Sequence, residues 1–245
     1  MKLTKCNIIF SLILSFTSVA QAERWVIATL EWPPYMCSRC PENGAGAKVL
    51  RTALKAIDVE VEFVFLTWSR AVKEGAHQKY VGYYPAWPED VFAGFKASDV
   101  AFKSPLGFIE PKGRPLRWEK LSDLKGKVIG TAQDYGNTVE FNNLVKSGVI
   151  KTEVVISDDT NIRKVAAGKL DGAVIDIANA KYYLGTSLKD IAHKVRVNSK
   201  ILENKDLLVA INGHHANKMT RLNAALKAVD GQKIIESYLK DYRVP

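Results

Sequence analysis

The sequence predicts an α/β protein of two units, each a mostly parallel sheet flanked by helices. Segments with the apolar pattern of strands alternate with segments of helical periodicity along most of the chain. This alternation is typical of parallel sheets, because parallel neighbours need a crossover connection that is usually a helix. The alternation restarts after EPKGRPLRW at 110–118, a stretch with prolines and a glycine that indicates a connection between two units.

The first unit is expected to open with the apolar segment RWVIATL, which stops at a pair of prolines and therefore predicts a buried strand. The alternating segment VEVEFVFL predicts a second strand. Between them, one helical face collects Leu50, Ala53, Leu54 and Ile57. The expected order is strand, helix, strand, helix and strand, at 24–30, 47–57, 59–66, from about residue 69, and at 80–84.

The second unit repeats this order, and two helices close the chain. Asn137 or Thr138 is available to cap the helix that follows the first strand of this unit. Strands are expected at KVIGTA (127–132), TEVVI (152–156), DGAVID (171–176) and DLLVAIN (206–212). Helices are expected at 136–148, 158–170, 177–185, 219–229 and around 234–238.

The first 22 residues have the layout of a cleavable signal peptide. Lys2 and Lys5 precede an apolar run from Ile8 to Val19, and the small residues of Ala20-Gln21-Ala22 follow it. The apolar run is too short to span a bilayer, so a membrane anchor is the less favoured interpretation. We therefore expect an exported, periplasmic chain that begins at Glu23.

The basic composition does not indicate nucleic-acid binding. The net charge is +9, but the basic residues are scattered and do not interleave with aromatic residues. Phosphate binding needs a concentrated basic patch, so a solvated basic surface is the better interpretation.

Export leaves Cys37 and Cys40 in MCSRCPE, a pair that could bind metal, exchange electrons or form a disulfide. Zinc would need two more ligands, and the four histidines show no matching spacing. A thioredoxin-like pair would stand at the start of a helix, whereas proline, asparagine and glycines follow here and indicate a loop. A structural disulfide is the favoured interpretation in an oxidising compartment.

Four segments resemble the extracellular solute-binding proteins of ABC importers, in the subgroup that includes the polar amino-acid binders. They are WPPYM after the first strand, LSDLKGKVIGTA followed by GNTVE, AAGKLDGAVIDIANAKYYL, and LNAALKAVDGQKIIESYLKDY near the end. Their order and spacing carry the resemblance, which covers most of the mature chain.

The resemblance implies a two-lobed clamshell of the periplasmic-binding-protein type II class that closes on a small solute. Residues 23–108 and 210–245 would form lobe 1, and residues 109–209 would form lobe 2. It also implies a monomer without cofactor or metal, and an ABC permease in the inner membrane as partner.

Ligand groups are expected from both lobes. Trp32 and Tyr35 would supply flat apolar walls with a polar edge. Gly136, Asn137 and Thr138 stand at a helix start, where free backbone N–H groups favour an anion, although an ordinary cap is an equal alternative. Asp176 matches the aspartate that receives the ligand's ammonium group in the amino-acid binders.

The stretch GYYPAWPED at 82–90 departs from the family. Amino-acid binders carry small hydroxyl residues here and then an arginine that grips the ligand's carboxylate. This chain has Tyr83, Tyr84 and Trp87, and Asp90 or Val91 takes the place of the arginine. We therefore expect an aromatic pocket wall that suits a cationic or ring-bearing solute. Arg70 is the nearest cation in sequence and the candidate to replace the missing arginine, although a surface position is expected for it.

Two other functions remain open. A periplasmic sensor that docks on a receptor kinase would use the same fold, and the sequence does not separate it from a transport protein. An enzyme similar to cyclohexadienyl dehydratase would need Glu31, Glu89 or Asp90 as a general acid. The sequence shows no nucleophile–base arrangement, so we expect a binding protein rather than an enzyme.

Overall fold

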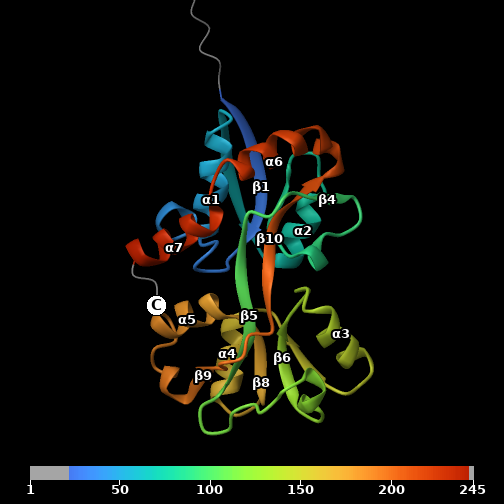
Figure 1. Cartoon of the computed structure of the whole chain (residues 1–245), viewed down its shortest axis with the longest axis vertical. Coiled ribbons are helices and arrows are strands. Elements are labelled where there is room, and N and C mark those ends of the chain that lie inside the picture. Colours follow the sequence, from blue (N-terminus) through green and yellow to red (C-terminus); the bar gives the residue numbers. More distant parts are fainter. Residues whose placement is uncertain (1–21, 243–245) are drawn as a thin grey trace, which may run out of the picture.

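The structure is a computed structural model and describes residues 22–242. The expected signal peptide, residues 1–22, therefore lies outside the described residues except for its last position. The described chain forms two lobes, one above the other in Figure 1, with long strands running between them. Within this described part, no helix is both long enough and apolar enough to cross a membrane.

The first lobe contains both ends of the described chain. Its strands are β1 (Glu23–Leu30), β2 (Val59–Leu66), β3 (Gly82–Ala86) and β4 (Phe95–Ala97). Its helices are α1 (Ala45–Lys55), α2 (Trp68–Gly75), α6 (Met219–Lys227) and α7 (Gly231–Asp241). Short 3-10 turns are η1 (Pro41–Asn43), η2 (Pro88–Asp90) and η5 (Gly213–Lys218).

The second lobe is built from the middle of the chain. Its strands are β6 (Val128–Ala132), β7 (Lys151–Val155), β8 (Gly172–Asp176) and β9 (Val195–Val197). Its helices are α3 (Val139–Lys146), α4 (Asp158–Ala166) and α5 (Ile177–Gly185), with 3-10 turns η3 (Leu121–Leu124) and η4 (Ala192–Lys194). Thr138 caps α3, because its hydroxyl accepts a hydrogen bond from the Phe141 amide at 3.2 Å, as the sequence predicts.

Two long strands, β5 (Phe102–Pro111) and β10 (Glu203–Asn212), connect the lobes. From Glu203 to Leu207, β10 pairs with β5, and from Leu208 onward it pairs with β3 and β4. The strand order is β2-β1-β3-β10-β5-β8-β6-β7, with β4 beside β10 and β9 beside β5. The sheet therefore passes from one lobe to the other through adjacent segments of two strands.

The predicted alternation of strands and helices is confirmed in both lobes, but the sheet is mixed. The pairs β1–β2, β1–β3, β6–β7 and β6–β8 are parallel, whereas β5 and β10 run antiparallel to their neighbours. The strands β4, β5 and β9 were not predicted from the sequence. Glu110 and Pro111 end β5, so the expected connection at 110–118 begins two residues too early. The expected loop after Cys40 is also too long, since α1 begins at Ala45.

Candidate ligand-binding site between the lobes

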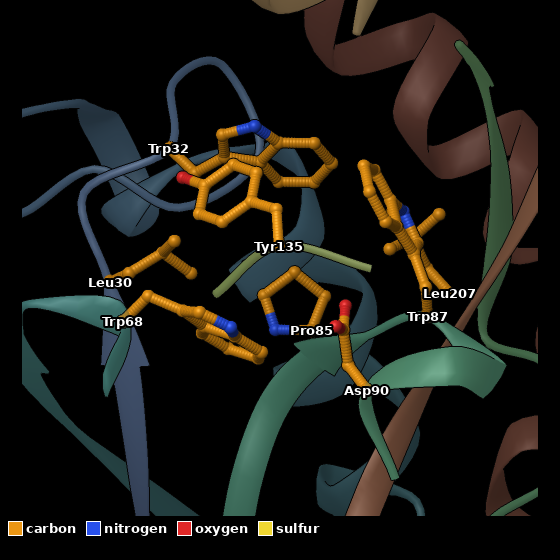
Figure 2. A pocket seen from close by; sticks show the side chains of 8 residues that line it. All are labelled: Leu30, Trp32, Trp68, Pro85, Trp87, Asp90, Tyr135 and Leu207. Atoms are coloured by element: carbon orange, nitrogen blue, oxygen red, sulfur yellow. The ribbon is translucent and has the colours of Figure 1, made fainter. Parts of the chain in front are cut away.

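A small cavity lies where the two lobes meet. Its volume is about 20 Å³, which is enough for a single water molecule. Most of its lining comes from the first lobe and from β10, while Tyr135 reaches it from the second lobe (Figure 2). The lining residues are Leu30, Trp32, Trp68, Pro85, Trp87, Asp90, Tyr135 and Leu207.

Tyr135 fills the middle of this aromatic group. Its ring lies 6.3 Å from Trp68 and 6.2 Å from Trp87, edge-to-face in both cases. Trp87 in turn meets Trp32 edge-to-face at 6.2 Å. Figure 2 shows the Tyr135 ring between Trp32 and Trp68, with the Asp90 carboxylate directed toward Pro85. The arrangement is a group of aromatic walls with one carboxylate at its edge.

Hydrogen bonds join the lobes around this cavity. Trp68 Nε1 donates to the Asp134 carbonyl oxygen at 2.8 Å, and the Ser69 hydroxyl donates to the Asp134 carboxylate. The Gly136 amide donates to Asp90 Oδ1 at 2.7 Å. The loop between β6 and α3 is thereby held by α2 and by η2 of the opposite lobe.

Further along the cleft, a second contact joins the lobes. Asn179 on α5 donates from Nδ2 to the carbonyl oxygen of Pro33 at 2.5 Å. Pro33 belongs to the segment between β1 and the cysteine pair. This contact adds to the bonds at Asp134 and Gly136 that join the two lobes.

Three buried carboxylates lie along the same interface, on Asp90, Asp158 and Asp176. Burial raises the pKa of Asp90 to about 7, although the Gly136 amide opposes the shift. Burial also raises the pKa of Asp158 to about 7, and the neighbouring carboxylate of Asp176 adds to it. The pKa of Asp176 is raised to about 6, again by burial, while the hydrogen bond from the Asn179 amide opposes the rise. Each shift has the same cause, since an ionised carboxylate loses its hydration inside the protein.

Several polar atoms near Asp176 have no hydrogen-bond partner among the described residues. Asp176 Oδ1 accepts from the Asn179 amide at 2.9 Å and so caps α5, while Asp176 Oδ2, Ser104 Oγ and Asn179 Oδ1 are buried and form no hydrogen bond of regular geometry. The hydroxyl groups of Ser104 and Tyr35 lie beside the Asp176 carboxylate and oppose the rise in its pKa. Buried acceptors without partners are costly, so this corner of the interface suits a hydrogen-bond donor.

No family model matches this chain, and no curated protein matches it in sequence. Solved structures match it over nearly their whole length. An ancestral arginine-binding protein bound to arginine superposes with a TM-score of 0.73 at 16% identity, over 91% of this chain and 99% of that one. A histidine kinase sensor domain, described as similar to periplasmic binding proteins, gives 0.73 at 16% identity, over 89% and 97%.

The fold is that of the two-lobed periplasmic binding proteins, type II. The GluR0 ligand-binding core from Nostoc punctiforme in complex with L-glutamate also matches, with a TM-score of 0.68 at 19% identity, over 90% of this chain and all of that one. At such identities the likeness establishes the fold alone. By their descriptions, these three matching structures are two ligand-binding proteins and one sensor domain.

In this periplasmic-binding-protein fold, three of the sequence-predicted residues line the cavity: Trp32, Trp87 and Asp90. Tyr35 does not line it. The Tyr35 ring packs 4.7 Å from the Trp32 ring and 5.2 Å from the Phe102 ring.

Tyr83 and Tyr84 do not line the cavity, because β3 is a central strand whose side chains are buried on both faces. Their hydroxyl groups donate to the carbonyl oxygens of Asp90, at 2.6 Å, and Gly46, at 2.8 Å. Tyr83 therefore supports the cavity indirectly, by holding the backbone of η2.

Arg70 does not reach the cavity. Its side chain is 65% exposed and lies 3.8 Å from the carboxylate of Glu74, one helical turn away. It borders an open groove of about 580 Å³ at the mouth of the cleft, which Glu31, Asp158 and Tyr183 also line. Arg70 therefore lies outside the cavity, at the edge of this groove.

The helix start at Gly136, Asn137 and Thr138 is already engaged within the chain. The Gly136 amide is bonded to Asp90, and the Thr138 hydroxyl caps α3. Asn137 is buried and donates weakly, at 3.5 Å, to the carbonyl oxygen of Tyr135.

Cys37 and Cys40 form the expected disulfide, in the loop between β1 and α1. Cys40 Sγ lies 3.5 Å from the hydroxyl of Tyr182 on α5, so the cross-linked loop touches the second lobe. The disulfide thus shapes a segment that borders the cleft.

Glu31 and Glu89, two of the residues considered for acid catalysis, do not line the cavity. Glu31 accepts from the Ser38 amide, and Glu89 pairs with Lys205 at 2.6 Å. Lys205 is buried and also lies 3.5 Å from Glu203, with its ammonium group 5.5 Å from the Trp87 ring. This cation is thus paired with two glutamates, and its charge also opposes the rise in the pKa of Asp90.

Trp68, Tyr135 and Asp158 were not expected at the site. Trp68 opens a helix and resembles a core residue, and Asp158 resembles an ordinary acid in the first turn of a helix. The sequence offers the clearest signal for Tyr135. This aromatic residue lies between the predicted strand at 127–132 and the predicted helix at 136–148. A loop at the carboxyl end of such a strand faces the cleft in this topology.

Proposed function

We propose that the protein captures a small cationic solute in the cleft between its lobes. The observation that carries the proposal is the combination of aromatic walls and buried carboxylates at the interface. Aromatic faces attract cations, and the attraction grows when water is excluded. Asp158 and Asp176 are buried near one another without a basic partner in the described structure. A cation bound between the lobes would therefore offset the free-energy cost of burying these carboxylates in ionised form.

Binding requires the lobes to separate. The cavity of about 20 Å³ is far smaller than the several hundred Å³ of a typical ligand pocket. The groove at the cleft mouth, of about 580 Å³, offers a route to it when the bonds at Asp134 and Gly136 break. Separation followed by closure would then bury the solute against Trp32 and Trp87.

We further propose that the captured solute is delivered to an ABC importer in the inner membrane, with the protein acting as a periplasmic monomer. The arginine-binding protein among the structural matches supports a solute-capturing role. The sensor domain among the matches supports a second candidate, in which the loaded protein docks on a receptor kinase. Co-purification of the exported protein with a permease or with a kinase would decide between these roles.

The proposed capture is tested by native mass spectrometry of the exported protein, followed by a thermal-shift screen. The screen compares cationic, zwitterionic and anionic solutes of similar size. A cation should raise the melting temperature of the wild type and fail to do so in Asp176→Asn. Asp171→Asn is the matched control, because Asp171 lies just before the opposite end of β8 and pairs with Arg114 at 3.6 Å. Stabilisation by anions alone would refute the proposal.

A further inference from the structure

We infer that Asp90 makes the cleft selective for amines that lack a carboxylate group. This inference rests on the proposed function and specifies its solute class. An α-amino acid brings both an ammonium group and a carboxylate into a binding site. The structure offers hydrogen-bond acceptors for the ammonium group. At the Gly136 amide, where the ligand's carboxylate would find a hydrogen-bond donor, the protein places the carboxylate of Asp90.

The backbone amides before α3 are the natural anion-binding element of this interface. Free N–H groups at a helix start favour a negative charge. Here Asp90 Oδ1 takes the Gly136 amide at 2.7 Å, and Thr138 Oγ1 takes the Phe141 amide at 3.2 Å. The chain's own side chains therefore satisfy the amides of Gly136 and Phe141, and the first of these bonds joins the two lobes.

The packing around Gly136 leaves no room for an additional group. A Cβ atom on Gly136 would lie 2.7 Å from Asp90 Oδ1 and 2.9 Å from the Cβ of Glu89. Both distances are shorter than ordinary contacts, so the backbone of the second lobe rests directly on η2. A ligand carboxylate could reach the Gly136 amide only by displacing Asp90.

The charges that face the interface also disfavour a carboxylate. Asp90, Asp158 and Asp176 are all buried there. None of the described residues that line the cavity is a cation: Lys205 is paired with two glutamates, and Arg70 lies outside the cavity. A carboxylate inside would be desolvated beside like charges without a cationic partner, whereas an amine meets the acceptors of Asp176, Ser104 and Asn179.

The test uses pairs of solutes that differ only in the α-carboxylate: agmatine and L-arginine, histamine and L-histidine, tyramine and L-tyrosine, and cadaverine and L-lysine. Calorimetry at pH 8 measures the affinity of each, above the pKa of about 7 that burial gives Asp90. For every pair that binds, we expect the wild type to prefer the amine by about tenfold or more. Asp90→Ala frees the Gly136 amide and removes a negative charge, so the preference should fall by about tenfold or more.

Asp176→Asn is the control for a general loss of negative charge. Both members of a pair share the ammonium group, so this variant should weaken both and leave their ratio unchanged. If Asp90→Ala does not fold, Asp90→Asn keeps an acceptor for the Gly136 amide without the charge, and the ratio should then fall partway.

Each outcome bears on a definite claim. Wild-type binding of any amino acid as tightly as its amine overturns the inference and leaves the proposed function standing. A ratio that does not change in the Asp90 variants also overturns the role of Asp90. If none of the eight solutes binds to the wild type or to a variant, the proposed cationic solute is refuted and the inference falls with it.

Discussion

Trp68 donates a hydrogen bond from its indole nitrogen to the carbonyl oxygen of Asp134, over 2.8 Å, and this bond joins the two lobes. The same indole ring forms a wall of the cavity and packs against Tyr135. One side chain therefore contributes both to the lining of the site and to the contact between the lobes. A solute that rearranged the wall would also change the contact, so we expect Trp68 to couple solute binding to movement of the lobes.

Trp68→Phe should loosen the closed arrangement. The variant keeps an aromatic ring but loses the bond to Asp134, so the open population should grow and the radius of gyration in solution scattering should increase. Trp25→Phe is the matched control, since Trp25 Nε1 bonds to Glu23 within the first lobe at 2.9 Å. Equal radii for both variants would show that the Trp68 bond does not hold the lobes together.

Tyr135 should contribute through its ring rather than its hydroxyl group. Tyr135→Ala removes the central wall of the aromatic group and should weaken the binding of a cationic solute by about 1 kcal/mol or more, measured by calorimetry. Tyr135→Phe retains the face and should bind within about twofold of the wild type. A loss in the Phe variant as large as that in the Ala variant would contradict this account.

Stability without added solute should fall as the pH rises from 5 to 7. In the folded state the pKa values of Asp90, Asp158 and Asp176 are raised to about 7, 7 and 6, so the folded chain holds more protons than the unfolded chain in this range. The free energy of unfolding must then decrease with increasing pH. Chemical denaturation at several pH values should show this slope, and Asp158→Asn should reduce it. A slope of opposite sign would show that these carboxylates are not desolvated.

The affinity for a cationic solute should change with pH in the opposite direction. A bound cation favours the ionised carboxylates, so protonation at pH 5 should weaken binding and pH 8 should strengthen it. Calorimetry with one amine at both pH values checks this, provided that the amine stays protonated throughout. Affinity that is independent of pH would mean that none of the three carboxylates contacts the solute.

Export should yield a chain that begins at Glu23 and carries the Cys37–Cys40 disulfide. The intact mass should match that chain with two hydrogen atoms fewer than the reduced form. Replacing both cysteines by serine should lower the melting temperature only slightly, because the cross-linked loop is short. A severe loss of stability in this variant would show that the loop does more than border the cleft.

The sequence predicts much of the fold because its local patterns agree with the tertiary structure. The apolar strand RWVIATL and the helical face of α1 are confirmed close to their predicted positions. β5 escaped prediction because its residues FKSPLGFIEP contain two prolines and a glycine, which usually interrupt strands. Its place between β10 and β8 depends on pairing with distant segments, which no local pattern reveals.

The candidate site was predicted less completely, because the tertiary structure decides which side chains are buried and which line the cavity. Trp32, Trp87 and Asp90 were expected at the cleft because they lie near strand ends in a distinctive composition. Tyr83 and Tyr84 share that composition, yet the central position of β3 buries them in the first lobe. Asp158 looks like any acid at a helix start, and only the tertiary structure, which places it beside Asp176 and Trp32, makes it a buried carboxylate.

The central claim, that the cleft binds a cation between buried carboxylates, is tested most directly by calorimetric titration of wild type and Asp176→Asn with a panel of small amines at pH 8. The account predicts that at least one amine binds the wild type with one-to-one stoichiometry, and that Asp176→Asn weakens this binding by about tenfold or more. Asp171→Asn should bind like the wild type. The account is contradicted if the variant binds every amine as tightly as the wild type, or if only neutral or anionic solutes bind.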